Sequence, residues 1–158
     1  MLAGGAGLAL TGLAAPVVAQ NGCSNRISRQ DYVRYVELFN NNDPGFLDFY
    51  HPDVVLYLGT QPVRGAQGIR DFYAEVKLYI RETVSVDQFV SDDTGVAVII
   101  PTVFECIKDW DDSFWGIDLK AGQKMEITSW GFYQVQDGRF TSIQSIRAAG
   151  SNGQWVSA

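Results

Sequence analysis

One stretch near the start of the folded part carries two tyrosines on what should be a buried face. In DYVRYVELFNNND, apolar and aromatic residues recur at i, i+3, i+4 and i+7, namely Tyr32, Tyr35, Val36 and Phe39. This is the spacing of one face of an amphipathic helix. A buried phenol needs a hydrogen-bond partner, which a phenylalanine would not need. We therefore expect these two hydroxyls to serve a purpose other than packing.

A single histidine is a candidate for proton transfer. His51 is the only histidine in the chain, and histidine is the side chain whose unperturbed pKa lies nearest neutrality. It precedes Pro52 and Asp53 at the expected end of a short helix. A capping or solvent-facing position explains it without chemistry, so both interpretations stand.

Two glutamates and one arginine add further candidates. Glu105 and Glu126 lie in strand patterns, where a charge must face water or a partner. A buried glutamate beside aromatic rings would have a raised pKa and could act as a base, whereas one on the wet face would not. Counting by twos from Ile143, Arg147 faces inward, where it would bind a carboxylate or phenolate; a rim position paired with an acid is the alternative.

No set of residues in the sequence has the spacing of a metal-binding or nucleotide-binding motif. Cys23 and Cys106 are the two cysteines, and neither has a neighbouring histidine. We interpret both as free thiols, although a disulfide is permitted in an exported protein. No residue set has metal-ligand spacing, and AGGAG does not follow a strand. The sequence thus indicates no cofactor.

The elements that would position these residues are helices first and strands afterwards. Ser28 precedes the first helix, PGFLDFYH predicts a short second one, and AQGIRDFYAEVKLYI a third, with Ile80 on its apolar stripe. VVLYLG is a strand and QPVRGAQG a loop. Strand patterns then follow one another, with Pro101 marking a bulge or edge and QDGR a hairpin turn. This order predicts an α+β fold.

Composition favours one globular domain. Hydrophobic residues make up 46% of the 158 residues, and the net charge of −6 argues against nucleic acid, which requires clustered basic residues. Residues 1–19 are uncharged and end in VVA, which predicts an export signal and a periplasmic or secreted protein. The missing basic segment leaves two alternatives: a start further upstream, or a leader that is not a signal. We expect a flexible tail over 20–27, the domain over 28–149 and a loose tail over 150–158.

Four segments in this order resemble the nuclear transport factor two-like superfamily, in its SnoaL-like and ketosteroid-isomerase-like branch. They are YVELFNNND, FYHPDVVLYL, VRGAQGIRDFY and FYQVQDGRFTSIQSIRA. The resemblance implies a cystatin-like cone, in which N-terminal helices pack into a curved antiparallel sheet around a deep apolar pocket. It also implies activity without a cofactor and a homodimer formed through the sheet. Separately, the Gly and Pro residues that interrupt the weakly hydrophobic segment 1–19 argue against a membrane span.

The resemblance implies roles for three tyrosines. Tyr35 falls where ketosteroid isomerases hold the tyrosine of their oxyanion site, and Tyr50 and Tyr73 fall near their helper tyrosines. Such a phenol network would polarise Tyr35 toward a developing enolate or phenolate. The chain departs from that family at Leu58, where the base aspartate is expected, and near Ser129, where a second acid is expected.

The function implied is that of a cofactor-free isomerase or lyase acting on a small hydrophobic molecule, aromatic or polyketide-like. Isomerisation, dehydration, cyclisation and retro-aldol cleavage remain open, with the base among His51, Glu105 and water. A non-catalytic exported ligand carrier and a structural dimeric module are the alternatives. The expected substrate contacts are Tyr32, Tyr57, Phe72, Phe104, Trp130 and Arg147.

Overall fold

A curled sheet and three helical segments make up the fold. The computed structural model describes residues 25–58, 61–151 and 153–157. The helical segments are α1 (Arg29–Asn40), the 3-10 helix η1 (Pro44–Phe49) and α2 (Gly65–Val76). The strands are β1 (Tyr50–Leu58), β2 (Gln61–Arg64), β3 (Ile80–Val84), β4 (Phe89–Ser91), β5 (Gly95–Cys106), β6 (Gln123–Gln136), β7 (Arg139–Arg147) and β8 (Val156–Ser157).

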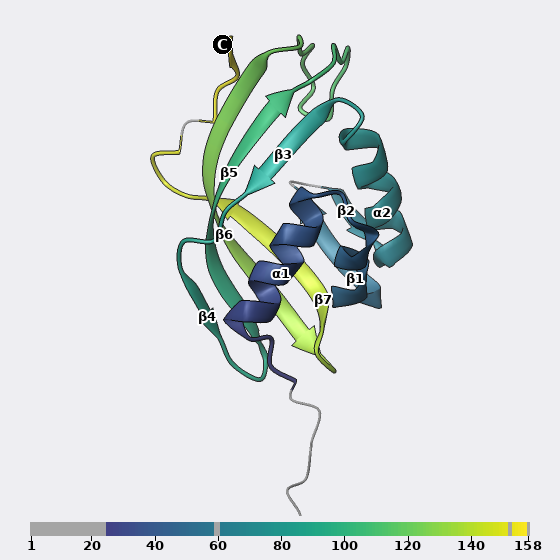
Figure 1. Cartoon of the computed structure of the whole chain (residues 1–158), viewed down its shortest axis with the longest axis vertical. Helices are drawn as coiled ribbons and strands as arrows, with labels where there is room; N and C mark the ends of the chain where they lie inside the picture. Colours follow the sequence, from purple (N-terminus) through teal and green to yellow (C-terminus); the bar gives the residue numbers. More distant parts are fainter. Residues whose placement is uncertain (1–24, 59–60, 152, 158) are drawn as a thin grey trace, which may run out of the picture.

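The sheet wraps around α1 and confirms the predicted α+β cone (Figure 1). Its strand order is β2-β1-β7-β6-β5-β3, with β4 beside β5 and β8 beside β6. Its pairs are antiparallel except β1 and β7, which run parallel, with Leu56 opposite Ile143. The long connection between β1 and β7 imposes no hairpin and so permits this orientation.

Helix α1 begins at the predicted cap. The Ser28 hydroxyl accepts a hydrogen bond from the Asp31 backbone N–H, and the Asp31 carboxylate accepts one from the Ser28 backbone N–H. This capping box pairs backbone N–H groups that the helix itself leaves free. The predicted apolar face is confirmed, because its four residues are all buried: Tyr32, Tyr35, Val36 and Phe39.

The third predicted helix ends earlier than its apolar stripe indicates. Helix α2 stops at Val76, and Ile80 instead opens β3, opposite Cys106. Ile80 is almost fully buried, so it satisfies the apolar period of a helix and that of a strand alike. Similarly, the predicted loop QPVRGAQG forms β2 and the first turn of α2.

Pro101 lies in the middle of β5 rather than in an edge strand. Its carbonyl accepts from the Ser85 backbone N–H, so its nitrogen faces the interval between Val84, the end of β3, and Phe89, the start of β4. Strand pairing is interrupted there, and a residue without an N–H is tolerated at such a place.

The predicted hairpin turn is present between β6 and β7, and residues near both ends of the described chain contact the domain. Asp137 and Gly138 both have positive φ, 52° and 71°, as expected of the predicted hairpin turn between β6 and β7. Residues expected to lie in loose tails contact the domain: Ile27 is buried, and the Trp155 ring lies edge-on to Trp115 with centroids 5.2 Å apart.

Cys23 and the predicted export signal lie outside the described residues. No helix in the described part of the chain has the length and apolarity needed to cross a membrane.

Candidate active site

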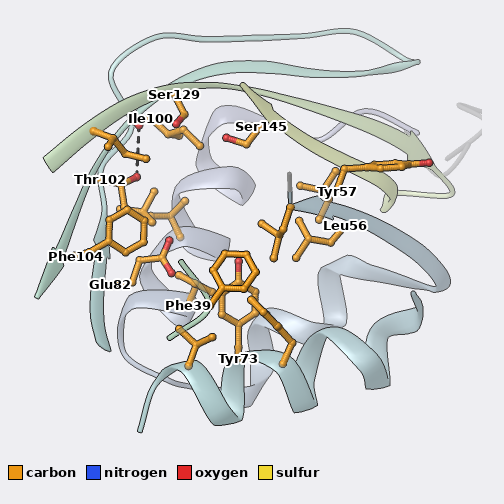
Figure 2. A pocket seen from close by; sticks show the side chains of 18 of the residues that line it. Phe39, Leu56, Tyr57, Tyr73, Glu82, Ile100, Thr102, Phe104, Ser129 and Ser145 are labelled. Atoms are coloured by element: carbon orange, nitrogen blue, oxygen red, sulfur yellow. Dashed lines mark hydrogen bonds between the residues drawn. The ribbon is translucent and has the colours of Figure 1, made fainter. Parts of the chain in front are cut away.

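A cavity of about 390 Å³ lies between the helices and the concave face of the sheet. That volume is within the range of roughly 300–1,000 Å³ typical of small-molecule sites. Helix α1 contributes Tyr35 and Phe39, helix α2 contributes Phe72 and Tyr73, and alternate residues of the strands complete the wall. Figure 2 shows Phe39, Leu56, Tyr73 and Phe104 around the hollow. The cavity is therefore mostly apolar, with polar groups at a few places.

Two of the predicted catalytic tyrosines meet inside this cavity wall. The hydroxyl oxygens of Tyr35 and Tyr50 lie 2.9 Å apart, and either can donate. Both side chains are buried and border the cavity. Because one hydroxyl donates to the other, the proton of the second stays available to a bound molecule.

A second phenol pair lies beside the first. The Tyr32 hydroxyl donates to the Tyr133 hydroxyl over 2.8 Å. Tyr133 borders the cavity, whereas Tyr32, a predicted substrate contact, is fully buried and does not. Accepting this bond polarises Tyr133, whose own proton has no acceptor within the described chain. Tyr32 thus lies behind the cavity wall and hydrogen-bonds a residue that borders the cavity.

Tyr73 borders the same cavity without joining either pair. Its ring lies edge-on to Phe39, with centroids 4.8 Å apart, and no hydrogen bond holds its hydroxyl within the described chain. Of the three tyrosines expected to form one network, Tyr35 and Tyr50 are therefore directly bonded, and Tyr73 lies near them.

Burial keeps all these phenols neutral. It raises the pKa of Tyr35, Tyr50 and Tyr73 well above 10, and that of Tyr133 to about 12. Neutral phenols are hydrogen-bond donors rather than bases. The wall can therefore stabilise negative charge that develops on a bound molecule.

A carboxylate that the sequence analysis did not select lies in the same cavity. Glu82, on β3 opposite Phe104, points into the hollow (Figure 2). Its side chain keeps some accessible surface because it borders the cavity. Desolvation raises the pKa of Glu82 to about 7, and the nearby Lys77 ammonium opposes this increase. Such a carboxylate can hold or release a proton near neutral pH.

Glu82 lies within electrostatic reach of the phenols. Its charge contributes to the raised pKa of Tyr35, Tyr73 and Tyr133. Lys77 is the C-cap residue that follows helix α2. Its ammonium donates to the Phe39 carbonyl, and its Nζ lies 3.9 Å from the centroid of the Phe39 ring. Burial lowers the pKa of Lys77, and Glu82 partly offsets that effect. The cavity thus brings an acid–base group and several donors together.

The acid–base candidates of the sequence analysis lie elsewhere. His51 follows Tyr50 in β1 and does not border the cavity; its Nδ1 accepts from the Asp53 backbone N–H over 3.2 Å. The Glu105 carboxylate lies 2.8 Å from Arg81 and 3.8 Å from Lys124, in ion pairs outside the cavity. Glu126 is exposed. Of these acid–base groups, Glu82 is the one that borders the cavity.

Most predicted substrate contacts do border the cavity. Tyr57, Phe72, Phe104 and Arg147 line it, and Trp115 and Phe114 line it near Phe72. Trp130 does not: it is 51% exposed on the opposite face of the sheet, because its neighbours Ser129 and Gly131 face inward. A strand alternates its faces, so Trp130 and Ser129 cannot both line the same wall.

Glu82 and Tyr133 could have been found by counting alternate residues. Ile80, Glu82 and Val84 share one side of β3, and the two flanking residues are apolar, which places the acid on the inner face. In β6 the inner series Ser129, Gly131 and Tyr133 follows the same rule.

Within the described residues, no group of three or more His, Cys, Asp or Glu side chains could hold a metal ion.

Comparison with known proteins identifies the family. Residues 32–143 match the model of the SnoaL-like domain. Similar solved structures include a SnoaL-like polyketide cyclase from Agrobacterium tumefaciens str. C58, with TM-score 0.59, 18% identity and coverage of 77% of this chain and 92% of that chain. An LEH-like epoxide hydrolase from M. tuberculosis has TM-score 0.57, 17% identity and coverage of 75% and 84%. TerC, co-crystallised with polyporic acid, has TM-score 0.57, 18% identity and coverage of 74% and 88%.

The curled sheet around a helix, with a cavity inside, is a fold that this chain shares with a solved nuclear transport factor two-like protein. The chain belongs to the SnoaL-like domain family. At these sequence identities, the similar structures support the fold only. The reaction has to be inferred from the residues of the site. Comparison with curated proteins finds no significant sequence match.

Proposed function

We propose that this protein is a cofactor-independent acid–base enzyme, an isomerase or lyase, that acts on a small hydrophobic ring-bearing molecule. The observation that carries the proposal is that Glu82, Tyr133 and the Tyr35–Tyr50 pair border one apolar cavity, and that Tyr133 and one member of that pair keep a free hydroxyl proton. A base and oxyanion donors facing the same space are what abstraction of a proton next to a carbonyl requires.

The proposed reaction starts with ionised Glu82. Its carboxylate takes a proton from the carbon next to the substrate carbonyl, and the electron pair of that C–H bond moves to the carbonyl oxygen. The cavity phenols donate hydrogen bonds to the enolate oxygen that forms. In an isomerisation Glu82 returns the proton to a different carbon; in an elimination the electron pair expels a leaving group.

Proton exchange on an enolisable cyclic ketone tests this first step directly. We expect the protein to accelerate exchange of the α-protons of 2-tetralone for deuterium, followed by ¹H NMR in D₂O. Exchange requires only the base and the oxyanion donors, so it does not depend on which later reaction occurs. Binding of 2-tetralone without accelerated exchange would instead support the non-catalytic ligand carrier, because the same cavity would then hold a ligand without reacting.

Lys77 should set the pH dependence of this exchange. The Lys77 ammonium opposes the rise in the pKa of Glu82, so replacing it by methionine removes a charge that favours the carboxylate. We expect Lys77→Met to move the midpoint of the pH–rate profile upward. Lys108→Met is the matched control, because Lys108 lies against Tyr79, outside the cavity. An unchanged or lowered midpoint in Lys77→Met would contradict the coupling.

We also propose a homodimer formed through the outer face of the sheet. Trp130, Phe132 and Ile146 lie there and are 51%, 44% and 52% exposed. Trp130 is directly opposite Ile146 on adjacent strands, so they form a continuous apolar patch. A second copy of the chain could cover this patch by two-fold symmetry.

Sedimentation velocity tests the dimer. We expect Trp130→Glu to shift the protein to monomer, with the dissociation constant rising by about 30-fold or more, because a buried aromatic anchor can contribute about 2 kcal/mol. Leu78→Glu is the control, since Leu78 is 62% exposed beyond the end of α2 and away from this patch. A monomeric wild type at all concentrations would refute the proposal.

The proposed compartment is the periplasm or the outside of the cell. The uncharged segment 1–19 supports export, and it lies outside the described residues. N-terminal sequencing of protein recovered from the secreted or periplasmic fraction tests it. We expect a mature chain that begins near Gln20; one that begins at Met1 would refute cleavage.

A further inference from the structure

The inner face of β6 and β7 carries three side-chain donors without a partner. They are the hydroxyls of Ser129 and Ser145 and the guanidinium of Arg147, and all three residues border the cavity. No hydrogen bond or ion pair occupies any of these side chains within the described part of the chain. Ser129 is buried, with 4% of its surface exposed, whereas Ser145 and Arg147 are exposed to solvent. Donors that the protein leaves free in a largely apolar cavity are available to a ligand.

Strand register places these donors together. Arg147 is directly opposite Ser129, and Ser145, two residues earlier on the same face of β7, is opposite Gly131. Directly opposite side chains on one face of a sheet are roughly 5 Å apart at Cβ, and diagonal ones are still within reach of long side chains. Figure 2 shows Ser129 and Ser145 on the same sheet wall, away from Tyr73 and helix α2.

The Arg147 guanidinium is supported from the C-terminal segment. A Cβ atom built at Gly153 would lie 2.7 Å from Arg147 Nη1 and 2.9 Å from the side chain of Ile127. The backbone at Gly153 therefore packs closely against the guanidinium, and a side chain at this position would displace the guanidinium. Gly153 also has positive φ, 50°, which disfavours most other residues.

This group lies across the cavity from Glu82. Arg147 is on β7 and Glu82 on β3, and β6 and β5 separate these strands. Three strand spacings correspond to roughly 14 Å measured along the sheet, and the curl of the sheet shortens the direct path. At such a separation the Arg147 charge neither pairs with nor neutralises Glu82. The cavity thus has a cationic end and an acid–base end, with apolar walls between them.

We propose that Ser129, Ser145 and Arg147 form a carboxylate-binding subsite, and that the natural ligand is a hydrophobic ring compound bearing a carboxylate. A guanidinium presents paired donors that match the two oxygens of a carboxylate, and hydroxyls beside it can donate to the remaining lone pairs. That this ligand is also the substrate rests on the proposed function. With its carboxylate bound at Arg147, the opposite end of the molecule would lie toward Glu82.

A matched pair of probes isolates the carboxylate. Isothermal titration calorimetry at low salt would compare 2-naphthoate with the neutral 2-naphthamide, which has nearly the same shape. We expect the wild type to bind naphthoate about 10-fold tighter or more, a preference of about 1.4 kcal/mol. Arg147→Gln should remove this preference by weakening naphthoate alone, and the double variant Ser129→Ala with Ser145→Ala should reduce it about three-fold.

Two controls keep the result interpretable. Arg139→Gln, at the other end of β7 and away from the cavity, should keep the full preference. Retained naphthamide affinity shows that Arg147→Gln is folded. Gly153→Ala should weaken naphthoate binding without removing any charge, since it displaces the guanidinium. Equal affinity of the wild type for both probes, or equal weakening of both by Arg147→Gln, would overturn the subsite.

The binding readout needs no turnover, so it separates this inference from the proposed function. Glu82→Gln should keep the preference for naphthoate even though it greatly slows proton exchange. A protein that exchanges the protons of 2-tetralone but does not distinguish the two probes would retain the proposed reaction and refute the carboxylate subsite.

Discussion

Replacing Glu82 by glutamine is expected to reduce α-proton exchange on 2-tetralone by roughly 10²–10⁴-fold, the usual contribution of a positioned general base. Glutamine has nearly the same shape and borders the cavity in the same way, but it cannot accept the proton. The rate of deuterium incorporation measures the effect. Glu126→Gln is the matched control, because Glu126 is exposed on the outer face of the sheet, and it should leave the rate unchanged.

The same substitution should stabilise the fold above neutral pH. Desolvation raises the pKa of Glu82 from 4.5 to about 7 on folding, so between these values the folded state binds more protons than the unfolded state. The free energy of unfolding therefore falls as the pH rises through this window, and the loss persists above it. Glutamine cannot ionise, so Glu82→Gln should be more stable than wild type by roughly 1–3 kcal/mol at about pH 8.

Thermal melts between about pH 4 and 8 check this sign. The difference in melting temperature between variant and wild type should grow with pH and level off above about 7, close to the pKa of Glu82. The wild-type exchange rate should rise over the same window, since the base must be ionised. A variant that loses both activity and stability at high pH would indicate a structural role for the carboxylate.

Removing a cavity phenol should produce the second largest effect. We expect Tyr35→Phe to lower the exchange rate by roughly 10²-fold, within the range for loss of one preorganised oxyanion donor. Tyr133→Phe should act similarly, because Tyr133 carries the free proton of its pair with Tyr32. Exchange kinetics measure both, and affinity for 2-tetralone should change little if the donor acts mainly on the developing charge.

Stability measurements separate the chemical effect from the structural one. Tyr35→Phe leaves the Tyr50 hydroxyl without its partner, which should cost about 1 kcal/mol of unfolding free energy. Tyr79→Phe is the control, since Tyr79 stacks on Trp110 outside the cavity and should leave exchange unchanged. Normal exchange in both Tyr35→Phe and Tyr133→Phe would refute the phenols as oxyanion donors.

The sequence by itself determined the α+β class, the capped first helix with its buried face, and the hairpin at Asp137 and Gly138. It also placed Tyr35, which borders the cavity, on that buried face. These features follow from local rules, because the apolar period of a helix, its capping groups and the residues of a tight turn act over a few neighbouring residues in any fold. The resemblance to the family added the curved sheet, the pocket, and the choice of Tyr50 and Tyr73, which border the cavity.

Counting alternate residues can place Glu82 on the inner face of its strand, but only the tertiary structure decided that this face lines the cavity and which distant residues pair. Glu82 and Glu105 both lie in strand patterns, but pairing of β3 with β5 directs Glu82 inward and leaves Glu105 in ion pairs with Arg81 and Lys124. The pairing of Tyr32 with Tyr133 spans 101 positions of sequence. Local sequence patterns do not specify which distant strands become neighbours, because register depends on how the whole sheet curls around the helix. Both groups central to the proposed chemistry depend on that arrangement.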